Sequence, residues 1–284
     1  MSTIVRALTI LTAAVAASAQ YLSVEIPAQP AAFPVRRPEP RSRVTEDPSV
    51  ILQNLIGSSS ANRRRALLDL GWKEEVKYAE DPTLIGDARF YRVNLDDDIE
   101  MEAILTLQVG RDRTRVLIFK KSESQWWRIG DFMLSYMWTA NSAERMLELR
   151  EIVGFDHKDI IIRVTAGGSD IQKEIELNMY RLYKGRLYRT FETTEEFALR
   201  RYSDAGEMIE DERNDIYYPE PQQGKDAYIV VRRSKQTMPS SEWGVLERPR
   251  EMVDCIPYRW DPIKYLFFAD RFASGRFCQP VKRK

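Results

Sequence analysis

The feature that most constrains the fold of this chain is an acidic residue followed by an alternating apolar strand, a pattern that occurs three times. The copies occupy residues 102–109, 159–166 and 226–233, and each begins with Glu or Asp. Alternation with a period of two is typical of β-strands. Because the pattern recurs at intervals of about 55 to 75 residues, it predicts a body built from repeated units.

Each copy is followed by a second predicted strand in which an aromatic residue directly precedes a basic one. A polar turn comes next, clearest at Lys184-Gly185, and a third strand follows the turn. Neighbouring residues in a strand point to opposite faces, so we expect the aromatic residues in the core and the basic residues pointing outward. The three pairs are Phe119-Lys120, Tyr180-Arg181 and Tyr258-Arg259.

These observations predict a mainly β fold of three antiparallel meander units, at about residues 88–135, 145–200 and 210–284. A single small sheet has one apolar face to bury, so adjacent units are expected to stack on each other. The stacked units would form a propeller-like or a sandwich-like body. Two short helices are predicted ahead of the units over residues 49–71, where capping residues precede apolar stretches that end at glycines.

The first 48 residues carry targeting and linker signals. Residues 1–19 combine Arg6, a short apolar stretch and Ala17-Ser18-Ala19, which together predict a cleaved signal peptide. Residues 20–48 contain six of the 14 prolines and are expected to form an extended linker before the β-rich domain at 49–284. We therefore expect an exported protein, periplasmic or extracellular, with no membrane span in the mature chain.

The cysteine and histidine content limits which disulfides, metal sites and catalytic groups the chain can form. Cys255 and Cys278 are the only cysteines, and in an exported chain such a pair favours a disulfide near the C-terminus. Two cysteines and one histidine cannot build a zinc site of the usual Cys/His type without carboxylate ligands. The single histidine, His157, lies in a predicted turn between two aspartates, and we expect a turn residue rather than a catalytic base.

The charge balance and the missing motifs exclude other functional classes. Lys+Arg 43 equals Asp+Glu 43, which argues against a nucleic-acid binder. The phosphate-loop, dinucleotide, HExxH and GxSxG motifs are absent. The sequence thus favours a non-catalytic envelope or extracellular protein with a binding or structural role, whose partner would be an unidentified protein or glycan. The oligomeric state stays open. The alternative is a secreted hydrolase that uses two carboxylates in a cleft.

An acidic run just before the first repeat strand is the candidate metal site. Asn94, Asp96, Asp98 and Glu102 place oxygen atoms at alternating positions of a short loop, which is how several ligands can converge on Ca²⁺. The alternative is a solvated acidic turn that binds no ion.

With this loop and the strands that follow it, residues 90–132 resemble the FG-GAP or VCBS repeats of integrin-like β-propellers. The resemblance implies a calcium loop at the start of a propeller blade. It adds a third possible role, a calcium-stabilised β-repeat interaction module.

Two tryptophans are the candidate binding surface. Trp127 follows Trp126 directly in a predicted strand, so one of them should be buried and the other at least half exposed. Trp243 lies in a predicted insertion at residues 235–254, where a long loop can carry a binding function. An exposed tryptophan could contact a glycan or a peptide, whereas the alternative is packing in the core.

Overall fold

The computed structural model describes residues 38–81, 85–96, 98–110, 113–135, 146–154, 157–169, 172–203, 206–220, 226–242 and 250–278. All described residues belong to one compact unit, Arg37–Lys284. The predicted signal peptide and residues 20–37 of the predicted linker lie outside the described residues. Within the described ranges, no helix has both the length and the apolar character needed to cross a bilayer.

Two short helices open the unit, as the sequence predicts. Helix α1 spans Pro48–Ile56, and the carboxylate of Asp47 caps it by accepting the backbone N–H of Ser49 at 2.8 Å. Helix α2 spans Ser60–Asp69 and is capped by the hydroxyl of Ser59. A 3₁₀-helix, η1, follows at Glu75–Glu80.

The first meander belongs to a five-stranded antiparallel sheet in the order β1-β5-β4-β3-β2. Strand β1 lies inside the segment that the sequence assigned to the linker, so the end of that segment is part of the fold. The strands are β1 (Ser42–Val44), β2 (Ile85–Val93), β3 (Glu102–Val109), β4 (Arg113–Ser122) and β5 (Gln125–Ser135).

The second and third meanders form one eight-stranded antiparallel sheet, in which β6 to β13 follow in chain order. Beyond the sheet lie the 3₁₀-helix η4 (Arg271–Ala273) and helix α4 (Ser274–Phe277), and the 3₁₀-helix η3 (Ser240–Glu242) follows β11. The strands are β6 (Leu147–Arg150), β7 (Asp159–Ser169), β8 (Gln172–Tyr183), β9 (Arg186–Ser203), β10 (Gly206–Tyr217), β11 (Tyr228–Pro239), β12 (Glu251–Asp261) and β13 (Leu266–Ala269).

The expectation that every unit stacks on the next is wrong for the second and third meanders. Strand β9 pairs with β10 along Glu196–Ser203, so these two meanders join edge to edge. The reason is the connection between them, which consists of residues 204–205 alone. So short a connection keeps both strands in one sheet as a hairpin.

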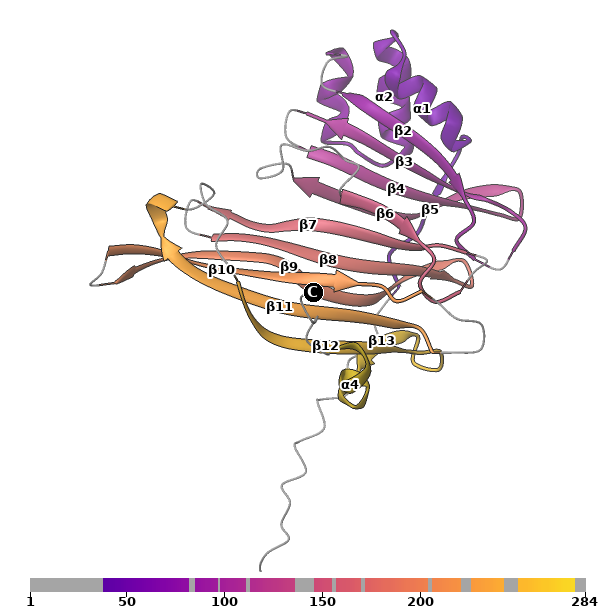
Figure 1. Cartoon of the computed structure of the whole chain (residues 1–284). Helices are drawn as coiled ribbons and strands as arrows, with labels where there is room; N and C mark the ends of the chain where they lie inside the picture. The colour runs from indigo at the N-terminus through magenta and orange to yellow at the C-terminus, as the bar shows by residue number, and fades with distance from the viewer. Residues whose placement is uncertain are drawn as a thin grey trace, which may run out of the picture. The chain divides into compact units, whose positions relative to one another are not determined.

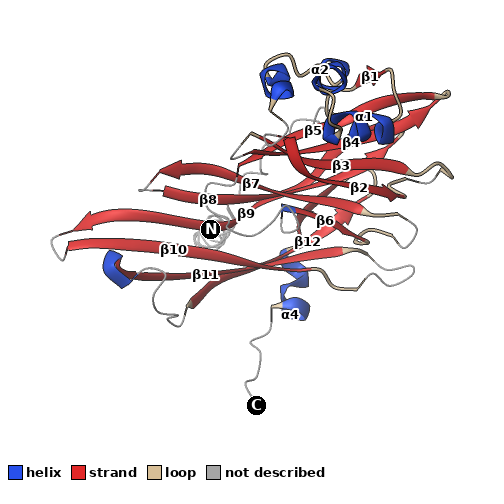
Figure 2. Cartoon of the chain, turned by 90° about the horizontal axis from the view of Figure 1, so that it is seen from above, coloured by secondary structure: helices blue, strands red, loops and turns tan. Residues whose placement is uncertain are grey.

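The elements stack in layers, with helices α1 and α2 above the five-stranded sheet and the eight-stranded sheet below it (Figures 1 and 2), and three large apolar cores lie in and under these layers. Helices α1 and α2 pack on one face of the five-stranded sheet, whose other face packs on the eight-stranded sheet. A third core lies on the far face of the eight-stranded sheet. Strands β3 and β7 are therefore covered on both faces: in β7, Ile160 and Ile162 contact the five-stranded sheet, while Ile161 enters the third core.

The eight-stranded sheet curls back on itself around the third core. In a flat sheet, β9 and β13 would lie about 19 Å apart, since four strand spacings separate them. Instead the rings of Phe191 in β9 and Phe267 in β13 have centroids 6.1 Å apart. The hydroxyl of Tyr265 also donates to the carbonyl of Leu182 at the end of β8, at 3.0 Å.

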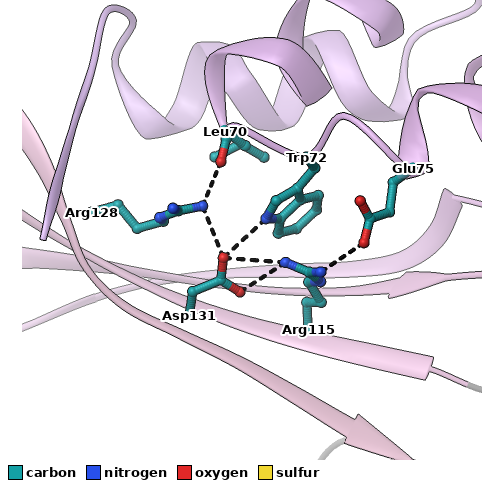
Figure 3. A network of polar contacts seen from close by, with 6 residues as sticks. All are labelled: Leu70, Trp72, Glu75, Arg115, Arg128 and Asp131. Carbon is teal, nitrogen blue, oxygen red and sulfur yellow. Dashed lines mark hydrogen bonds and ion pairs between the residues drawn. The ribbon is translucent and has the colours of Figure 1, made fainter. Parts of the chain in front are cut away.

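A polar network ties the helical layer to the five-stranded sheet (Figure 3). Asp131 in β5 accepts hydrogen bonds from the indole of Trp72 at 3.0 Å and from Arg128 at 2.8 Å. Arg115 in β4 bonds Asp131 at 3.1 Å and reaches Glu75 at the start of η1 at 2.6 Å. The network fixes the position of the helical layer on the sheet.

Candidate functional site

A pocket of about 840 Å³ lies where the two sheets meet, at the ends of their strands. This volume is within the range of about 300 to 1,000 Å³ that is usual for small-molecule sites. Four connections line the pocket: the β2–β3 loop, the β6–β7 loop, the turn of the β8–β9 hairpin and the β12–β13 turn. Strands β4 and β5 add side chains beside them. All three meanders therefore contribute to one site.

Two of the four predicted metal ligands, Asp96 and Asp98, line one wall of the pocket. Carboxylate oxygens of Asp96, Asp98 and Glu102 lie within 4.8 Å of one another, as the spacing of the acidic run predicted. The ammonium of Lys120 lies among them, 2.8 Å from Asp96, 2.7 Å from Asp98 and 2.8 Å from Glu102. A cation of the protein itself thus occupies the centre of this cluster. Asn94 precedes it in the chain, and its backbone carbonyl accepts the N–H of Lys158 at 3.0 Å.

The charges of this cluster are strongly coupled. Burial alone would lower the pKa of the Lys120 ammonium, but the hydrogen bonds to the three carboxylates outweigh burial and raise it. Partial burial works against the shift at Asp98, yet the hydrogen bonds from Lys120 and from the N–H of Glu100 hold its pKa below the usual value. Burial raises the pKa of Glu102. Lys120 is therefore charged at neutral pH, and the acids around it are engaged by one ammonium.

The second meander repeats this arrangement with other residues. Asp159 is fully buried, and its carboxylate pairs with Arg181 at 2.8 Å. The same carboxylate accepts the backbone N–H groups of Ile152 and Val153, at 3.2 and 3.3 Å. In the first meander, Glu102 accepts the N–H of Leu95 in the same way, at 2.8 Å. The acid that leads each repeat strand thus holds both the preceding loop and the basic residue of the next strand.

This pairing corrects the expectation that the basic residues point outward. Lys120 and Arg181 are 7% and 5% exposed, because each has a buried acid as its partner. The third meander is different: Asp226 and Arg259 lie 3.5 Å apart, but both side chains remain well exposed.

The aromatic side of the pocket contains one of the two predicted contact tryptophans. Trp127 is half-buried and lines the pocket, and the guanidinium of Arg41 lies over its ring at 4.4 Å. Its neighbour Trp126 is buried and donates its indole N–H to Asp47 at 3.0 Å. The two adjacent rings differ in exposure as expected, but Trp127 is less than half exposed. Trp243, the other predicted contact residue, lies outside the described residues.

Rings from the eight-stranded sheet complete this side. Tyr265 packs against Trp260 and Tyr183, with ring centroids 5.0 and 4.7 Å away. The ammonium of Lys184 lies 5.0 Å from the centroid of the Tyr183 ring. His157, from the β6–β7 loop, lines the same pocket and contacts the guanidinium of Arg181.

The disulfide that the sequence predicts is present in the C-terminal part of the chain. Cys255 in β12 and Cys278, directly after α4, are joined with an S–S distance of 2.00 Å. Arg232 holds the same segment by donating to the carbonyl of Phe277 at 3.0 Å. Neither cysteine lines the pocket.

Sequence reasoning missed several residues that line the pocket. Arg41 was assigned to a linker, and Lys184 was interpreted only as part of a turn. His157 was expected to be a turn residue outside any site, and Tyr265 was not among the candidate residues. The repeat pattern could have located part of this pocket, because corresponding parts of the meanders line it. These parts are the loop before the leading acid and the end of the second strand.

Comparisons with protein-family models, with curated proteins and with solved structures find no match for this chain. The resemblance of residues 90–132 to FG-GAP or VCBS repeats stays a prediction.

Proposed function

We propose that this chain is an exported, non-catalytic protein that binds a saccharide in the pocket between its two sheets. The observation that carries the proposal is the difference between the aromatic and the acidic groups of the pocket. Aromatic rings line the cavity, whereas the carboxylates of Asp96 and Asp98 are paired with Lys120. Pockets of this size, with aromatic walls and a few polar groups, are typical of small-molecule binding. The disulfide and the predicted signal peptide support export.

The lining groups suit a saccharide. The apolar face of a sugar ring can pack on the indoles of Trp127 and Trp260. The carboxylate oxygens of Asp96 and Asp98 can accept hydrogen bonds from sugar hydroxyls while they remain paired with Lys120.

The same geometry favours binding over hydrolysis. Glycoside hydrolases need one carboxyl group that gives up a proton and a second that acts as base or nucleophile. Here both acids that line the pocket share the ammonium of Lys120, and the pKa of Asp98 is lowered, which makes it a poor proton donor. A calcium-stabilised module is also less well supported, since Lys120 fills the centre of the proposed ligand set.

Calorimetric titration of the purified chain with neutral, N-acetylated and acidic trisaccharides tests the proposal. We expect at least one of them to bind, and Trp127→Ala to weaken that binding by about tenfold or more. Tyr202→Ala is the matched control, because this ring is 78% exposed in β9 and does not line the pocket. If no trisaccharide binds, or if both variants bind like the unmodified chain, the proposal is wrong.

A further inference from the structure

Given the saccharide-binding function proposed above, we infer that the ligand carries an anionic group and that Arg41 and Lys184 bind it. The two side chains reach the pocket from different sheets: Arg41 directly precedes β1, and Lys184 lies in the β8–β9 hairpin. Both are exposed. A single anionic group that contacted both would bridge the two sheets.

The pairing of charges in the pocket singles out these two cations. Lys120 is engaged by three carboxylates, and Arg181 is paired with buried Asp159. Within the described ranges, Arg41 and Lys184 have no carboxylate partner and lie instead over aromatic rings, those of Trp127 and Tyr183. They are therefore the lining cations whose charge the described chain leaves uncompensated.

The position of the guanidinium over an indole suits anion capture. A guanidinium donates hydrogen bonds within its own plane, so stacking on the Trp127 ring leaves its N–H groups available to a ligand. A planar fork of this kind matches a carboxylate or a phosphate with two parallel hydrogen bonds. A sugar ring placed beside Trp127 would bring its acidic substituent within reach of Arg41.

The second cation is held near the same spot by the packing of the hairpin. Trp127 and Lys120 are direct partners across strands β5 and β4. The Lys184-Gly185 turn rests on Lys120, since a methyl group at position 185 would lie 4.0 Å from Cδ of Lys120. Arg41 thus lies over one member of the Trp127–Lys120 pair, and the turn that carries Lys184 lies against the other.

The acids of the pocket determine which ligand groups can lie near the β2–β3 loop. Asp96 and Asp98 would repel an anionic group placed near the β2–β3 loop, and they favour hydroxyl groups there. The site therefore favours a saccharide that places hydroxyls near the β2–β3 loop and an acidic group near Arg41 and Lys184, as a uronic acid or a sugar phosphate can.

Titrations with matched trisaccharides that differ only at C6 test the inference. The probes are α-1,4-galactotriose, its triuronate and its 6-phosphorylated form, and a β-1,4-glucose series provides a second backbone. We expect one anionic form to bind about tenfold or more tightly than its neutral counterpart. The triuronate and the phosphate arms distinguish the two sources of the anionic group. The double variant Arg41→Gln/Lys184→Gln should remove this preference and leave the neutral trisaccharide unaffected.

The control variant is Arg64→Gln/Lys73→Gln, which removes the same charge from exposed positions outside the pocket and should keep the preference. If neutral and anionic forms bind equally, the inference is overturned while saccharide binding stands. If the control abolishes the preference as the pocket variant does, the inference is overturned as well. If no form in either series binds, the proposed function itself fails.

Discussion

At the scale of residues, the acidic cluster is stabilised by a basic side chain from another strand. The spacing of Asp96, Asp98 and Glu102 was enough to predict that their carboxylates converge. It was not enough to predict the cation between them, because Lys120 reaches Glu102 through the register of β4 on β3. An ammonium is a compact charge with three donors, so it can serve three carboxylates as a small metal ion would.

Replacing Lys120 by Met should turn this cluster into a calcium-dependent element. The change leaves three carboxylates without their cation, so we expect the free energy of unfolding to fall by about 3–5 kcal/mol. Calcium should then raise the melting temperature of the variant but not that of the unmodified chain. Lys121→Met is the control, since Lys121 points to the opposite face of β4. Equal calcium responses of the unmodified chain and the variant would contradict this explanation.

Replacing the acid at the start of the second repeat strand should destabilise the chain far more than replacing the acid at the start of the third. Asp159→Asn leaves the Arg181 charge buried without its partner, and we expect a loss of about 3–5 kcal/mol in urea unfolding. Asp226→Asn breaks an exposed pair with Arg259 and should cost less than about 1 kcal/mol. Similar losses for the two variants would show that burial does not decide the strength of these pairs.

At the scale of elements, the sequence was most informative about strands and their turns. The strands were predictable because the apolar pattern has a period of two, and the helices because of the caps at Asp47 and Ser59. The joining of the second and third meanders into one sheet was not predictable, because it depends on a connection confined to residues 204–205. The predicted turn at Lys184-Gly185 has positive φ at both residues, as has Glu123-Ser124 between β4 and β5.

In both hairpin turns, glycine should be the more stable residue at the second turn position. Ser124 has φ 63°, a conformation that a side chain disfavours, so Ser124→Gly should stabilise the chain by about 0.5–1 kcal/mol. Gly185→Ala should destabilise the chain by about 1 kcal/mol, because position 185 has φ 69°. The new methyl group would not clash with any neighbour, so backbone strain alone causes the loss. Urea unfolding measures both, and a destabilising Ser124→Gly would contradict the assigned turn geometry.

At the scale of the whole described unit, two features place the pocket: the packing of one sheet on the other and the curl of the eight-stranded sheet. Neither follows from a local pattern. The curl brings Tyr265 from the last connection onto Leu182 at the end of β8, across five strand positions. Trp127 could be proposed from its place beside Trp126 in a predicted strand, whereas Arg41, Lys184 and Tyr265 needed the three-dimensional arrangement.

The disulfide should stabilise the C-terminal part of this unit. Cys255 and Cys278 are 23 residues apart in the chain, and closing a loop of this size is worth about 3 kcal/mol in the chain-entropy model. We expect Cys255→Ala/Cys278→Ala to lower the free energy of unfolding by that amount. A reducing agent should lower the melting temperature of the unmodified chain and leave that of the variant unchanged. A stability that does not respond to reduction would argue against a structural role of the bond.

The central claim is that the pocket binds an acidic saccharide without cleaving it, because Lys120 holds both acids that line the pocket. Native mass spectrometry after prolonged incubation with the triuronate reads binding and cleavage in one spectrum. The account predicts a complex of one saccharide per chain and a saccharide of unchanged mass. Shortened saccharides, or the absence of any complex, would contradict it.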